Sequence, residues 1–121
     1  DLAKVSRASA IIVAGTTLPH GVVTPNVVLP IANVAEEEGT FTNLRGRVQR
    51  FLQAKAAPGL ARPSWFALAD LNTAIGVKSD YFLPSAVFAA LAQAERAFAG
   101  LSYETLSLYG ASVSDAKAGA A

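Results

Sequence analysis

The sequence predicts an α/β fold in which a strand-rich first half is followed by helices. Two short apolar runs rich in β-branched residues, at 10–14 and 26–29, are typical of strands, and apolar residues recur at helical spacing after residue 63. Of the 121 residues, 52% are hydrophobic and 16% charged, and the mean hydropathy is +0.36. A chain this apolar is expected to form a core.

Residues 1–53 are predicted to form the strand-and-hairpin part. A short helix or helix end is expected at 1–8, and the run AIIVA at 10–14 predicts a strand buried on both faces, as in a parallel sheet. A loop follows, and Pro30 ends the second strand. We expect one or two helical turns at 31–38, and then a β-hairpin over 40–52 that turns at 43–46.

The second half is predicted to be helical. Residues 54–63 read as a linker, and Ser64 is the expected N-cap of a helix reaching residue 75, with Gly76 beyond its end. A second helix should run from Pro84 to Gly100 and a shorter third helix from Ser102. The predicted organisation is therefore a linker at 54–63, a helical part at 64–111 and a flexible tail at 112–121.

Two strands cannot by themselves form a parallel sheet with covered faces. We therefore expect further strands from a longer polypeptide, or from a second copy in a homo-oligomer, and the lack of methionine even at position 1 favours a fragment. The isolated chain is expected to fold only marginally.

Composition excludes several functions. A net charge of +1 gives no basic face for nucleic acid, and the absence of cysteine excludes disulfides and cysteine-bound iron–sulfur clusters within this chain. The apolar runs are too short to cross a membrane, and no signal-peptide pattern opens the chain. No catalytic residue and no metal site is predicted.

Residues 27–65 carry a resemblance to a known family. They contain VVLP, an acidic run, GTFTN, GRVQ, Pro-Gly and ARPSW in this order and at fixed spacing. This segment resembles the molybdopterin oxidoreductase superfamily. The resemblance implies that Thr40, Thr42, Asn43 and Arg47 lie in the region of the pterin nucleotide. Pro25-Asn26 and Arg45 depart from the family pattern, each removing a carboxylate, and predict that cofactor binding is vestigial here.

The last part of the chain predicts the branch of that superfamily. The segment at 97–113 looks like the end of the large iron–sulfur subunit of bacterial NADH-quinone oxidoreductase (complex I). This resemblance implies a non-catalytic scaffold segment in the peripheral electron-transfer arm of an NADH:quinone oxidoreductase. No cofactor is expected in the chain, whereas 4Fe-4S and 2Fe-2S clusters are expected upstream in the full-length subunit.

The same resemblance implies partners and a location. The partners would be the remainder of that iron–sulfur subunit and other complex I subunits of the peripheral arm, at the cytoplasmic face of the inner membrane. The alternative is the carboxy-terminal part of a molybdopterin-dependent, formate dehydrogenase-like oxidoreductase. In that case Thr40, Thr42, Asn43 and Arg47 would contribute to cofactor contacts.

Three groups of side chains are candidates for a site. Adjacent helical residues do not face one another, so Glu36 to Glu38 are interpreted as a solvated helix end and not as a metal site. His20, the only histidine, is expected to be an exposed loop residue. The basic cluster suits either phosphate recognition or salt bridges to neighbouring domains, of which we favour the second. The cluster comprises Arg45, Arg47, Arg50, Lys55 and Arg62.

Overall fold

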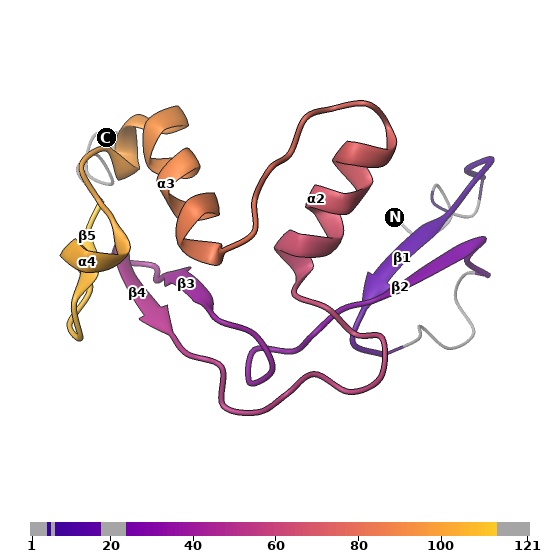
Figure 1. Cartoon of the computed structure of the whole chain (residues 1–121), viewed down its shortest axis with the longest axis horizontal. Coiled ribbons are helices and arrows are strands. Elements are labelled where there is room, and N and C mark those ends of the chain that lie inside the picture. Colours follow the sequence, from indigo (N-terminus) through magenta and orange to yellow (C-terminus); the bar gives the residue numbers. More distant parts are fainter. Residues whose placement is uncertain (1–4, 6, 18–23, 114–121) are drawn as a thin grey trace.

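The computed structural model describes residues 5, 7–17 and 24–113, and it confirms the predicted α/β class (Figure 1). The predicted helix at 1–8 lies largely outside the described residues. His20 lies wholly outside them. The elements, in chain order, are strands β1 (Ile12–Gly15), β2 (Val27–Pro30), β3 (Gly39–Thr42) and β4 (Arg47–Phe51), helices α2 (Ser64–Ala74) and α3 (Pro84–Ala94), the 3-10 helix η1 (Arg96–Phe98), helix α4 (Tyr103–Leu106) and strand β5 (Ala111–Ser112).

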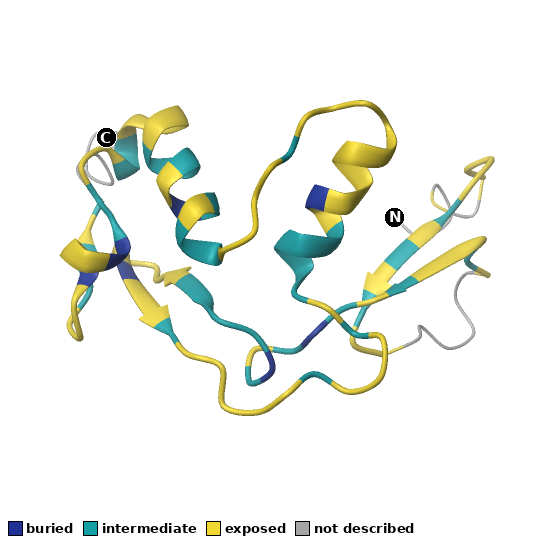
Figure 2. Ribbon diagram, in the orientation of Figure 1, coloured by how far each residue is buried: buried dark blue, intermediate teal, exposed yellow. Residues whose placement is uncertain are grey.

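Strands β1 and β2 form a parallel pair, with Ile12 opposite Val27 and Gly15 opposite Pro30. The side-chain oxygen of Asn26 accepts a hydrogen bond from the backbone N–H of Ile11 at 2.8 Å, which supports the start of this pairing. The prediction that the first strand is buried on both faces is wrong for the chain by itself. Ile12 is 55% exposed, because no described element packs over the side of this pair that carries Ile12 and Val27, here called its outer side (Figure 2).

The predicted hairpin is confirmed as β3 and β4, and β5 extends it into an antiparallel sheet of order β3-β4-β5. Asn43 shapes the turn. Its Oδ1 accepts hydrogen bonds from the backbone N–H groups of Arg45 (2.9 Å) and Arg47 (3.0 Å). Ser112 belongs to β5 and so departs from the flexible tail predicted for 112–121, most of which lies outside the described residues.

The core lies where this sheet meets α3 and α4. Val48 and Leu106 are completely buried, and Phe88 and Tyr103 pack with them. The Phe88 ring lies edge-on to Phe98, with ring centroids 6.2 Å apart, so the apolar stripe predicted for the second helix does face the core. That helix is shorter than predicted, since α3 ends at Ala94 and the 3-10 turn η1 follows.

Two predictions for the middle of the chain are corrected. Residues 31–38 form a tight turn and not a helix, because the side chains of Asn33 and Glu36 bond to the local backbone. Ser64 is the first residue of α2 and not its cap. The side chain of Glu37 takes that role, since its Oε2 accepts the backbone N–H of Ser64 at 3.1 Å.

The apolar stripe predicted for α2 is largely uncovered. Leu68 is 59% and Ile75 68% exposed, and Ala69 is the buried residue of this helix. Two large apolar side chains of this helix therefore stay mostly in contact with water in the described part of the chain.

We expect Gly110→Ala to destabilise the chain by about 2 kcal/mol or more. Gly110 has a φ of 71°, and a Cβ there would collide with the carbonyl oxygen of Val48. Urea unfolding measures this loss.

Gly76→Ala is the matched control for that variant. Gly76 has a φ of 83° but no atom within 4 Å of the place that an added methyl group would take, so only the backbone strain of about 1 kcal/mol is expected. Equal losses in the two variants would contradict the close packing of Gly110 on β4.

Candidate functional site

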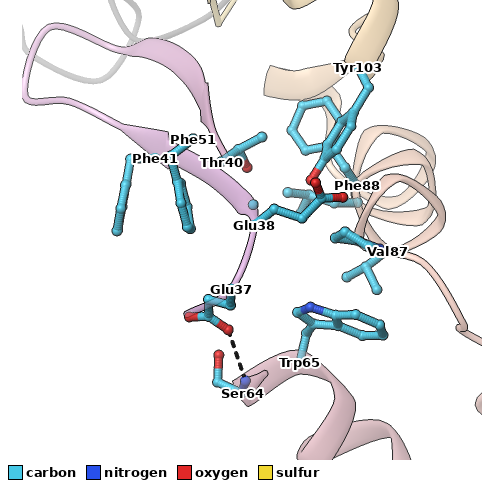
Figure 3. A pocket seen from close by; sticks show the side chains of 13 residues that line it. Glu37, Glu38, Thr40, Phe41, Phe51, Ser64, Trp65, Val87, Phe88 and Tyr103 are labelled. Carbon is cyan, nitrogen blue, oxygen red and sulfur yellow. Dashed lines mark hydrogen bonds between the residues drawn. The ribbon is translucent and has the colours of Figure 1, made fainter. Parts of the chain in front are cut away.

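A pocket of about 260 Å³ lies beside the first residues of α2 and α3 (Figure 3). Its wall comes from five separate segments: residues 37–41, Phe51, the starts of the two helices, and Tyr103. The side chains are mostly aromatic or apolar, with two carboxylates among them. This composition is typical of a binding pocket.

The two carboxylates have different surroundings. Glu37 is held by the Ser64 backbone N–H described above. Glu38 is half-buried and extends toward Tyr103 and Phe88 (Figure 3). Within the described part of the chain, its side chain forms neither a hydrogen bond nor an ion pair.

Tyr103 lies between a cation and an anion. Burial raises the pKa of its hydroxyl, the Glu38 carboxylate raises it further, and Arg50 acts in the opposite direction. The guanidinium carbon of Arg50 lies 4.2 Å from the centroid of the Tyr103 ring, and its Nη1 is 3.5 Å from the Tyr103 carbonyl oxygen. Arg50 is thus held on the tyrosine.

Glu36, the first of the three glutamates, lies outside this pocket and is buried. Its Oε1 forms an ion pair with Lys55 Nζ at 2.9 Å, and its Oε2 accepts the backbone N–H of Asn33 at 3.1 Å. The Asn33 N–H, followed by Lys55, holds the pKa of Glu36 below its ordinary value. The prediction that the three glutamates form a solvated helix end is therefore wrong for Glu36.

The structure does not gather the four residues predicted near a pterin. Alternation along β3 and its register with β4 put Thr40 and Thr42 on the face that carries Val48, whereas Asn43 and Arg47 belong to the opposite face. Thr40 lines the pocket, Asn43 is used in the turn, and Arg47 Nε donates to the carbonyl oxygen of Tyr109 at 2.8 Å. Their proposed cofactor role stays a prediction.

The basic cluster is used mostly within the chain. Besides the Arg47, Arg50 and Lys55 contacts above, Arg62 Nη1 lies 3.7 Å from Asp70 Oδ2 and its guanidinium packs over the Phe66 ring. Among the described residues, no group of three or more potential ligands could hold a metal ion, and none of the helices there is long and apolar enough to cross a membrane.

Sequence reasoning missed the residues that make the pocket: Glu37, Glu38, Trp65 and Tyr103. They are separated by up to 66 positions, and no motif links them. Phe88 is buried in the core, whereas both it and Trp65 also border the pocket.

Comparison with known proteins gives a consistent result. Residues 1–74 match the molybdopterin oxidoreductase family. A Bacillus subtilis protein provisionally named formate dehydrogenase YrhE is 40% identical over 81 residues, or 67% of this chain and 8% of that protein. The alpha subunit of a formate dehydrogenase from Methanococcus maripaludis is 40% identical over 87 residues, or 70% of this chain and 13% of that subunit. A Staphylococcus aureus protein with a similar provisional name is 36% identical over 81 residues, or 67% of this chain and 8% of that protein.

These relatives correct the functional prediction. They carry formate dehydrogenase names, so the interpretation as a scaffold segment of the iron–sulfur subunit of complex I is wrong. The complex I interpretation rests on the tail at 97–113, which is a short stretch outside the residues that match the family. The superfamily resemblance at 27–65 lies within the matched region and is confirmed.

The depressed pKa of Glu36 predicts a dependence of stability on pH. A carboxyl group whose pKa is lower in the folded state stabilises the fold above its unfolded pKa, and this contribution is lost as the pH falls toward the folded value. We expect the unfolding temperature to fall from about pH 5 downward, and Glu36→Gln to weaken that fall.

Glu95→Gln, at an exposed glutamate at the end of α3, is the control for that measurement. Its unfolding temperature should follow the wild-type curve across the same pH range. If Glu36→Gln also follows the wild-type curve, the Asn33 and Lys55 contacts do not stabilise the fold.

Asn43 offers a test of its role in the turn. Asn43→Ala removes the acceptor of two backbone N–H groups and should cost about 1–2 kcal/mol in urea unfolding. Asn43→Asp keeps an oxygen in place and should lie within about 0.5 kcal/mol of wild type. Equal losses would show that the turn does not need this acceptor.

Proposed function

Because the chain belongs to the molybdopterin oxidoreductase family, we propose that it works as part of a formate dehydrogenase-like, molybdopterin-dependent oxidoreductase. The observation that carries the proposal is the identity of 36% to 40% with proteins named formate dehydrogenases. The chain spans 8% to 13% of the length of these relatives, so the reaction belongs to a larger protein.

The described residues do not fit a pterin nucleotide by themselves. The pocket of about 260 Å³ carries Glu37 and Glu38, whose negative charges would repel its phosphates. The residues predicted to contact the pterin lie on two faces of the hairpin, and the Arg47 Nε and Asn43 Oδ1 are already bonded. We propose that residues outside the described part of this chain supply the further contacts that the cofactor needs.

The role proposed for the chain is to supply a folded α/β segment to that larger protein. The exposed stripe of α2 and the open outer side of β1 and β2 support this role, because both leave apolar side chains in water. Full burial of one exposed leucine or isoleucine side chain stabilises a protein by about 1.5–3 kcal/mol relative to leaving it in water. Contact with further strands or helices would provide this stabilisation.

The test is analysis of the protein that contains this chain, purified without oxidants. We expect molybdenum or tungsten together with a pterin nucleotide, and formate-dependent reduction of a viologen dye. The same preparation given NADH in place of formate serves as the substrate control. Protein with iron but no molybdenum, tungsten or pterin, and no response to formate, would overturn the proposal.

A further inference from the structure

The Glu38 carboxylate is a half-buried charge without a counter-ion among the described residues. Arg50, the nearby cation, is held by the ring and carbonyl of Tyr103, and Glu37 already accepts the Ser64 N–H. The ion pairs within the described part of the chain join other residues. A carboxylate partly withdrawn from water favours a cationic partner.

The walls around Glu38 suit such a cation. Trp65 and Phe88 border the pocket, and the stacked rings of Phe41 and Phe51, with centroids 4.8 Å apart, close its other side (Figure 3). Aromatic faces attract ammonium and guanidinium groups through their quadrupole. An anionic or neutral ligand would gain less from these walls and would meet Glu38.

Trp65 contributes an unpaired donor at the pocket wall. Its indole Nε1 is buried and has no acceptor within the described part of the chain. A buried donor without a partner is costly, and native proteins rarely leave one so. A side chain that enters with its own backbone brings carbonyl acceptors, which a free organic amine does not, and one of them pairs with this N–H if the indole turns to expose it.

The pocket volume limits the occupant. About 260 Å³ lies below the 300–1,000 Å³ typical of small-molecule sites. It suits one long side chain. Arginine is favoured over lysine, because a planar guanidinium pairs with a carboxylate and stacks on aromatic rings at the same time.

We propose that this pocket receives an arginine side chain from a polypeptide segment outside this chain, with the guanidinium paired to Glu38 and stacked among the aromatic walls. The source of that arginine rests on the proposed function, since the relatives extend far beyond the 8% to 13% that this chain covers. The arrangement of Glu38 and the aromatic side chains in the pocket does not depend on which reaction the larger protein catalyses.

The probe is N-acetyl-L-arginine amide, added to the full 121-residue chain. Trp65 is the only tryptophan, so its emission reports on the pocket directly. We expect a saturable change in emission with a dissociation constant in the millimolar range. N-acetyl-L-citrulline amide, which has the same shape without the charge, should give no saturable change. Glu38→Gln should weaken arginine binding roughly ten-fold, and Glu95→Gln should leave it unchanged.

Equal responses to arginine and citrulline, or no effect of Glu38→Gln, would overturn the proposal. So would the absence of a response in a chain that circular dichroism shows to be folded.

A second measurement uses the larger protein that contains this chain, where the pocket is expected to be filled. There Glu38→Lys should lower the unfolding temperature clearly and Glu95→Lys should not, and equal effects would also overturn the proposal. Metal content and formate oxidation test the proposed function separately, so failure of one proposal is distinguishable from failure of the other.

Discussion

Burial of Val48 is the constraint on which the carboxy-terminal half depends. This residue lies in the central strand of β3-β4-β5 and is fully enclosed by Phe88, Tyr103 and Leu106. The enclosure requires the chain after α4 to return close to β4, which Gly110 permits because it has no side chain. One buried valine therefore joins the hairpin, two helices and the last strand into a single small core.

The run of three glutamates organises the middle of the chain. Glu36 ties the turn at 31–38 to Lys55, Glu37 caps α2, and Glu38 enters the pocket. Three adjacent carboxylates thus reach three surroundings, because an irregular backbone lets neighbouring side chains diverge. The pocket exists only where this run, the hairpin and the two helix starts come together.

Apolar surface connects the structure to the comparisons. Leu68 and Ile75 of α2, and Ile12 and Val27 of β1 and β2, are apolar side chains that the described part of the chain leaves exposed. The relatives are far longer than this chain, and the proposed function places these faces against polypeptide that lies outside it. The family match concentrates in residues 1–74, which contain β1 to β4 and α2.

Short-range patterns in the sequence predict most of the local elements and the family. β-Branched runs, the turn residue Asn43 and the glycines after the helices specify strands, hairpin and helix ends through short-range preferences. How those elements pack and which side chains they bury depend on the folded chain as a whole. Neighbours distant in the chain determine whether an apolar face is covered, which glutamate is buried and where Arg47 points. Local sequence patterns do not encode these outcomes. The pocket around Glu38 likewise depends on the tertiary structure, since its walls come together only after the chain folds.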